Sequence, residues 1–146
     1  MQRRVRRAAE EDKRMDKVKV EAPVRATEDP EKVGEAVLNV FPELEIEVED
    51  DAVRGTGDSG SLRNLQEALE KRRIRLTARN ILKKHLRGNS TWFYINKQAA
   101  LMNRVNVLEE SISALGDILV EIESDDIMGL IDWLAPDVSV PEDVAD

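Results

Sequence analysis

A segment of concentrated positive charge lies between residues 71 and 87. The chain has 146 residues and a formal net charge of −8, yet this segment holds eight basic residues and no acidic one. They are Lys71, Arg72, Arg73, Arg75, Arg79, Lys83, Lys84 and Arg87. Exposed helices usually carry both signs, because like charges one turn apart repel each other. The segment is therefore typical of a surface that meets a polyanion.

Apolar residues in the same segment recur with the period of an α-helix. Ile74, Ala78 and Ile81 share one face with His85 at about 100° per residue, which predicts that His85 packs rather than binds a ligand. Arg75 and Arg79 are expected on the opposite, solvated face. An ordinary exposed helix is the alternative, since Lys and Arg favour helices and cover apolar surface with their aliphatic stems.

An aromatic segment follows this helix after a turn at Gly88. Residues 91–96 are rich in β-branched and aromatic side chains, which predicts a strand. Trp92 and Tyr94 would lie on one face of it, and Phe93 and Ile95 on the other. The first pair fits a core, a subunit interface or a surface on which RNA bases stack. All three remain open from the sequence.

The rest of the chain divides into short helices and strands. Period-two alternation predicts strands over residues 17–25, 44–48, 53–56 and 118–122, and helical spacing predicts helices near 30–40, 62–72 and 125–134. Asp29, Ser61 and Ser124 are the expected N-caps. Pro23 cannot donate to a ladder, so its strand is expected at an edge or with a bulge. The helix over 62–72 either continues into the basic helix or breaks near Arg73.

Composition excludes several classes of function. The chain has no cysteine, which excludes disulfides, thiolate zinc sites and cysteine nucleophiles and fits a cytoplasmic protein. No apolar run approaches the ~20 residues of a membrane helix, and the start of the chain lacks the apolar core of a secretory signal. The glycine-rich segment 55–61 lacks the Gly-Lys-Ser/Thr ending of a phosphate loop. We expect no enzyme, no catalytic residue, no cofactor and no metal.

The acidic excess does not argue against a polyanionic partner, because the charges are segregated. From Glu109 to Asp146 there are twelve acidic residues and no Lys or Arg. We expect a basic N-terminal arm over residues 1–16, a single domain over 17–136 and an acidic C-terminal tail over 137–146.

Four short motifs resemble a known family. They are Thr27-Glu28-Asp29-Pro30-Glu31-Lys32-Val33, Asn96-Lys97-Gln98-Ala99-Ala100, Leu115-Gly116-Asp117-Ile118 and Ile131-Asp132-Trp133-Leu134-Ala135-Pro136. Between about residues 17 and 136 the chain resembles the archaeal uncharacterised protein family 0201, in an RNA-binding-domain group likened to a large-subunit ribosomal protein of the fifth class. The resemblance implies an α+β fold, an antiparallel sheet with helices packed on one face, a homodimer and RNA binding. It brings no catalytic residues.

The leading interpretation is a non-enzymatic protein that contacts RNA phosphates through the basic helix. The expected RNA-binding residues are Arg72, Arg75, Arg79, Lys83 and Arg87, with Lys97 at the end of the aromatic strand. The alternative is a protein-interaction scaffold or dimerisation module whose basic helix meets an acidic partner.

Overall fold

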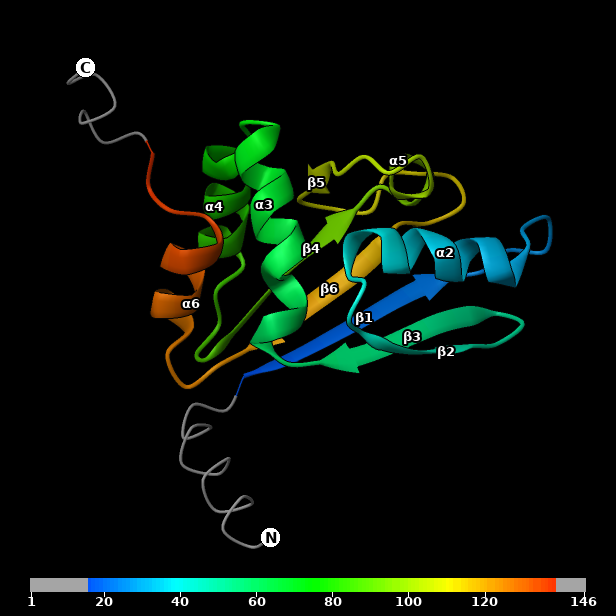
Figure 1. Ribbon diagram of the computed structural model, residues 1–146, viewed down its shortest axis with the longest axis horizontal. Coiled ribbons are helices and arrows are strands. Elements are labelled where there is room, and N and C mark those ends of the chain that lie inside the picture. Colours follow the sequence, from blue (N-terminus) through cyan, green and yellow to red (C-terminus); the bar gives the residue numbers. More distant parts are fainter. Residues whose placement is uncertain (1–15, 139–146) are drawn as a thin grey trace, which may run out of the picture.

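Helices cover one face of a six-stranded antiparallel sheet, which confirms the α+β fold (Figure 1). The structure is a computed structural model that describes residues 16–138. Its elements are β1 (Lys17–Pro23), α2 (Pro30–Val40), β2 (Glu45–Val48), β3 (Ala52–Gly57), the 3-10 turn η1 (Ser59–Leu62), α3 (Arg63–Lys71), α4 (Arg75–Lys84), β4 (Ser90–Ile95), α5 (Lys97–Leu101), β5 (Val107–Leu108), β6 (Ile118–Glu123) and α6 (Ile127–Leu134). Apart from their innermost positions, the expected basic arm and acidic tail lie outside the described residues.

The sheet separates the core from an open face. Its strand order is β2-β3-β1-β6-β4-β5, and side chains alternate across each strand. Val18 and Val20 of β1 and Phe93 and Ile95 of β4 point into the core, as their alternation predicts. The helices complete this core with Val33, Val37, Leu65, Leu69, Leu82, Ile131 and Leu134. In Figure 1, α2 and α3 lie in front of the sheet.

The expected edge position of the first strand is wrong. β1 lies in the interior of the sheet, between β3 and β6. Pro23 is its last residue, and the β1–β6 ladder has already ended at the pair of Glu21 and Leu119. The missing N–H of Pro23 therefore leaves no gap in that ladder.

Aspartates cap α2, η1 and α6, and two of the three expected caps are wrong. Asp29 caps α2 as expected, but Asp58 rather than Ser61 begins η1, and Asp126 rather than Ser124 caps α6. The Ser124 hydroxyl is buried and accepts a hydrogen bond from the Asp126 backbone N–H at 3.0 Å. A carboxylate is the stronger acceptor for the N–H groups at a helix start.

The basic segment breaks at Arg73, one of the two arrangements that its sequence allows. Arg73 has a φ of 58°, in the left-handed region, and the chain reverses there from α3 into α4. The Ile74 N–H donates to the Leu69 carbonyl at 3.0 Å, and the Arg73 N–H donates to the Glu70 carbonyl at 3.1 Å. These two bonds form the motif that commonly ends a helix with a left-handed residue.

Candidate nucleic-acid interface

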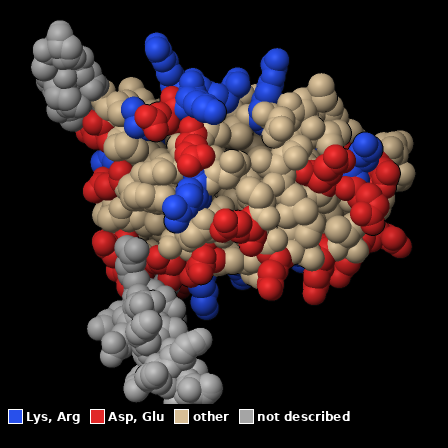
Figure 2. All heavy atoms as spheres, viewed as in Figure 1, with Lys and Arg blue, Asp and Glu red and all other residues tan. Residues whose placement is uncertain are grey.

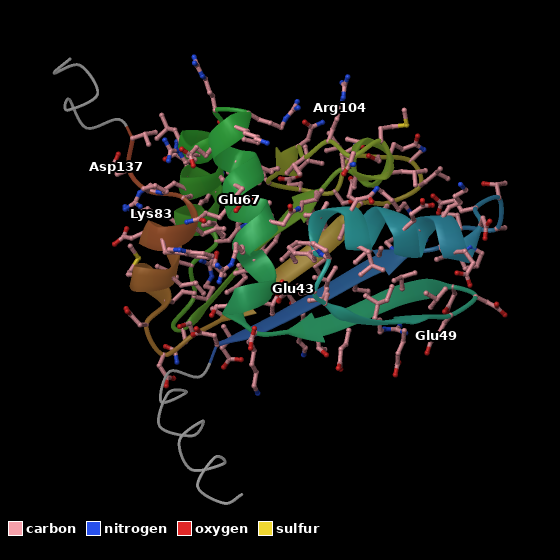
Figure 3. The ribbon with its side chains drawn as sticks, in the orientation of Figure 1. Glu43, Glu49, Glu67, Lys83, Arg104 and Asp137 are labelled. Atoms are coloured by element: carbon pink, nitrogen blue, oxygen red, sulfur yellow. The ribbon has the colours of Figure 1, made fainter. Side chains whose placement is uncertain are left out.

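The turn between α3 and α4 collects exposed positive charge. Lys71, Arg72 and Arg73 are exposed and Arg75 is half-buried, while Arg104, from the segment after α5, lines the same hollows as Arg72. We name these five residues the basic tip. Within residues 16–138, none of them takes part in an ion pair. Lys and Arg gather at this end of the protein in Figure 2, and Arg104 points away from the body in Figure 3.

Two helices end at the basic tip with the same backbone motif. Arg73 ends α3, and Asn103, with a φ of 64°, ends α5. After α5, the Arg104 N–H donates to the Ala99 carbonyl at 2.8 Å, and the Asn103 N–H donates to the Ala100 carbonyl at 2.9 Å. Arg73 and Asn103 are the two non-glycine residues of positive φ in the described part of the chain. Left-handed backbone is unfavourable for such residues and tends to gather at functional sites.

Arg72 and Arg104 border two neighbouring hollows. The first has a volume of about 280 Å³ and is also lined by Asn39, Asn64 and Glu67. The second has a volume of about 560 Å³ and lies against α5. Its other lining residues are Gln98, Ala99, Met102 and Asn106. The two arginines therefore stand between two concave surfaces rather than on a flat one.

Asparagine side chains hold the elements around the first hollow in place. Asn39 Nδ2, near the end of α2, donates to the Ala100 carbonyl of α5 at 2.9 Å. Asn64 Nδ2, near the start of α3, donates to the Val40 carbonyl of α2 at 3.0 Å. Three helices are thereby joined by side-chain hydrogen bonds, so the basic tip sits on a built framework.

Arg79 does not lie on a free surface, contrary to expectation. Its side chain is only 11% exposed, because α6 covers it. Nη1 donates to Asp132 Oδ1 at 2.8 Å and to the Ala135 carbonyl at 3.1 Å. Arg79 therefore joins α4 to α6, and its guanidinium is engaged within the protein.

Lys97 is also inside the protein. Its side chain is 4% exposed, and Nζ donates to the Pro23 carbonyl at 2.6 Å, to the Leu115 carbonyl at 2.8 Å and to Glu28 Oε1 at 2.9 Å. A lysine ammonium has three N–H donors, and all three are engaged. No donor is left for a phosphate.

The other end of α4 is partly neutralised by the protein's own acids. Lys83 and Arg87 are exposed, as expected, and Arg87 Nη1 donates to the Leu86 carbonyl at 2.8 Å. Lys84 pairs with Glu109, and this hydrogen bond raises the pKa of Lys84 and lowers the pKa of Glu109. The positive charge that remains free is therefore concentrated at the basic tip.

Arg104 is the member of the basic tip that the sequence does not reveal. It lies 17 positions beyond Arg87, the last residue of the basic segment, and Lys97 is the one basic residue between them. The position of α5 in the fold brings Arg104 beside Arg72, and the sequence alone does not reveal this position.

Trp92 and Tyr94 lie on the open face of the sheet rather than in the core. Both are half-buried, and the Trp92 ring stacks on the buried His85 ring with centroids 3.5 Å apart and an angle of 5° between the planes. His85 Nδ1 lies 2.8 Å from the Trp92 carbonyl oxygen. His85 thus packs, as expected. Tyr94 contacts Trp92 edge to face, with centroids 5.8 Å apart.

Residues 16–138 offer neither a metal centre nor a membrane-spanning helix. Residues 16–138 contain no cluster of three or more His, Cys, Asp or Glu side chains that could hold a metal ion. In the same range, no helix combines the length and apolar character that a membrane crossing requires.

Comparison with known proteins identifies the family. A family model described as RNA binding matches residues 17–123. A UPF0201 protein from Methanothermobacter thermautotrophicus is 98% identical over 132 residues, which cover 90% of this chain and 100% of that protein. This chain belongs to the UPF0201 family.

The fold agrees with a solved UPF0201 structure. The crystal structure of the UPF0201 protein from Methanococcus jannaschii superposes with a TM-score of 0.74 at 35% identity, over 84% of this chain and 94% of that one. A UPF0201 protein from Thermococcus onnurineus is 42% identical over 126 residues, which cover 83% of this chain and 92% of that protein. The resemblance in the four motifs is therefore confirmed as membership of an archaeal family.

Proposed function

We propose that this UPF0201 chain is a cytoplasmic, non-enzymatic RNA-binding protein that contacts backbone phosphates through the basic tip. The observation that carries the proposal is the convergence of Arg72 and Arg104 from distant segments beside unpaired Lys71, Arg73 and Arg75. Guanidinium groups form charge-assisted, often bidentate hydrogen bonds with phosphate. The description of the matching family model supports RNA as the polyanion.

The proposed contact set differs from the one expected from sequence. Arg72 and Arg75 remain in it, and Lys71, Arg73 and Arg104 join them. Arg79 leaves it because α6 covers the side chain and engages Nη1, and Lys97 leaves it because all three of its donors are engaged inside the protein. Lys83 and Arg87 are peripheral contacts, at the far end of α4 from the tip.

Exposed acidic side chains along the β2 edge of the sheet favour RNA binding at the basic tip rather than at this edge. Glu45 and Glu47 of β2 are exposed, as are Glu43 and Glu49 on either side of it. In Figure 3, the labelled Glu43 and Glu49 lie along this edge, away from Arg104 at the basic tip. An acidic edge repels phosphates while the tip attracts them, so the field of the protein steers RNA toward the tip.

Salt dependence of RNA binding tests the proposal. Each phosphate contact contributes about 0.7–0.9 to the slope of log affinity against log salt, so five contacts predict a slope of about −3.5 to −4.5. The double variant Arg72→Gln/Arg104→Gln should flatten the slope by about 1.5–2. The matched control is Arg25→Gln/Lys32→Gln, which removes the same charge from exposed positions before and within α2, outside both the basic tip and the open face of the sheet.

The control decides how the result is interpreted. If both double variants flatten the slope equally, RNA binding depends on net charge and the tip is not the contact surface. If the unmodified protein binds no RNA at low salt, the proposal fails and the acidic protein partner is favoured instead.

We also propose that the chain forms a homodimer through the open face of the sheet. Tyr94 lies opposite Leu119 of β6 and Leu108 of β5 in the strand register, and with Trp92 these half-buried side chains form an apolar area. Sedimentation at tens of micromolar protein should show a dimer, and Tyr94→Lys should shift it to monomer. A monomeric unmodified protein would return Trp92 and Tyr94 to the hypothesis of base stacking.

A further inference from the structure

The hollow against α5 has the chemistry of a nucleotide site. We propose that it holds one unpaired nucleotide of the bound RNA, with the base against α5 and the phosphate between Arg72 and Arg104. This inference rests on the proposed function and adds a specific ligand to one part of the basic tip.

The size of the hollow suits this ligand. Its volume of about 560 Å³, in a hollow that is open to solvent on one side, leaves room for one nucleotide whose backbone continues outside it. In duplex RNA the bases are stacked and paired, so their faces and pairing edges are hidden from a side-on pocket. A nucleotide in a single strand, a bulge or an overhang can turn its base into the hollow.

Apolar and basic side chains form two of the three chemical parts of the lining. Ala99 and Met102 supply an apolar wall, and the Met102 side chain, 72% exposed, is accessible to a ligand. A polarisable thioether makes favourable contacts with aromatic rings, nucleobases included. Arg72 and Arg104 supply the phosphate ligands.

Amide side chains complete the lining. Gln98 and Asn106 line the hollow and are exposed, and within residues 16–138 their side chains make no hydrogen bond. Carboxamides pair with the donor and acceptor groups on base edges, which gives the site a means of distinguishing bases. An apolar wall, free amides and two guanidiniums together match the face, edge and phosphate of a nucleotide.

The helix that carries the wall is held rigidly. Asn96 Oδ1 accepts from the Ala99 N–H at 2.7 Å at the start of α5, and the left-handed Asn103 closes its end. Lys97 anchors the first turn inside the protein, while the next residue, Gln98, faces solvent. Lys97 is therefore a positioning residue for this site rather than a contact.

The first hollow fits a nucleotide less well. At about 280 Å³ it is half as large, and Glu67 lines it and repels phosphate. The amides of Asn39 and Asn64 already donate to backbone carbonyls. Those side chains join helices rather than read a ligand.

A pair of matched RNAs tests the inference. One is a blunt duplex, and the other is the same duplex with a single unpaired 3′ nucleotide. We expect the overhang to increase affinity about tenfold, as one good amide–base pair does. Gln98→Ala and Asn106→Ala should each reduce this advantage without changing the salt slope for the blunt duplex. Asn80→Ala, which removes an exposed amide from α4, is the matched control and should change neither value.

The outcomes separate this inference from the proposed function. Equal affinity for both RNAs with the expected salt slope would overturn the nucleotide site and leave the basic tip standing. A free nucleoside 5′-monophosphate provides a further arm, read from NMR shifts of the α5 amides. If the free nucleotide shifts the α5 amide signals, and the overhang RNA binds more tightly than the blunt duplex, the site is confirmed. If it binds while no RNA does, both RNA proposals fall and the hollow is a site for free nucleotides.

Discussion

Lys97 and Glu28 form an ion pair inside the protein across 69 positions of sequence. Nζ lies 2.9 Å from Oε1, and the two side chains are 4% and 13% exposed. Glu28 Oε1 also accepts from the Arg25 N–H at 2.9 Å, and Lys97 also bonds the carbonyls of Pro23 and Leu115. One ammonium group thus joins the end of β1, the start of α5 and the loop before β6.

The first prediction concerns this pair. Lys97→Met should lower the free energy of unfolding by about 3–5 kcal/mol, because it leaves Glu28 buried without its counter-charge. Urea unfolding measures the loss. Adding Glu28→Gln should recover part of it, since the uncompensated charge is then gone. Unchanged stability of the single variant would mean that Lys97 does not hold β1, α5 and the loop before β6 together.

The second prediction compares the two left-handed residues, Arg73 of the basic tip and Asn103 beside it. Arg73→Gly and Asn103→Gly should each raise the free energy of unfolding, by up to about 1 kcal/mol, because glycine adopts positive φ without steric penalty. The gain at Asn103 should be the smaller, since asparagine tolerates this region. Thermal unfolding should shift by a few degrees, roughly 2–5 °C.

RNA binding separates these two variants. Arg73→Gly should flatten the salt slope by about 0.7–0.9, whereas Asn103→Gly should leave it unchanged. A stabilised Arg73→Gly protein with an unaltered slope would show that Arg73 serves only the turn.

The third prediction concerns the contact between α4 and α6. Arg79→Gln should lower the free energy of unfolding by about 1–2 kcal/mol, because the Asp132 carboxylate and the Ala135 carbonyl both lose a charged donor. The expected loss of stability is small because Asp132 is largely exposed and water screens the ion pair. Lys83→Gln, on the exposed part of the same helix, should stay within about 0.5 kcal/mol of the unmodified protein. Equal effects of the two variants would contradict the assignment.

The fourth prediction concerns stability at low pH. Burial acts to raise the pKa of Asp117, but hydrogen bonds from the Ser113 hydroxyl and backbone, the Ile112 N–H and the Ser111 hydroxyl outweigh it and lower this pKa below 3.8. A lowered carboxyl pKa contributes stability that is fully present above 3.8 and is lost as pH falls through the folded value. Asp117→Asn should therefore be less stable than the unmodified protein near neutral pH.

The difference between the two proteins should shrink as pH falls from 3.8 toward the lower pKa of Asp117 in the folded protein, because the unfolded chain takes up the proton first. Urea unfolding between pH 7 and pH 3 measures it. A constant difference over this range would show that the Asp117 charge does not stabilise the loop over residues 111–113.

Local pattern determined much of the fold. The alternation of residues 91–96 correctly separated Phe93 and Ile95 from Trp92 and Tyr94 on opposite faces of the strand, and Asp29 before Pro30 correctly marked the start of α2. The basic segment was also visible in the sequence, which allowed either a continuous helix or the break that the structure shows at Arg73. These features depend on residues within a few positions of each other, so their physics is present in the sequence itself.

The tertiary structure decided which basic side chains are free. Arg79 and Lys97 are typical surface residues by type, yet α6 covers the first and three distant acceptors enclose the second. Arg104 looks isolated along the chain, yet the path of α5 brings it to the hollows beside Arg72. A charged side chain can bind a ligand only if no other part of the protein covers it or engages its hydrogen-bond donors. That depends on segments between 18 and 74 positions away in the sequence, which helical or strand periodicity does not encode.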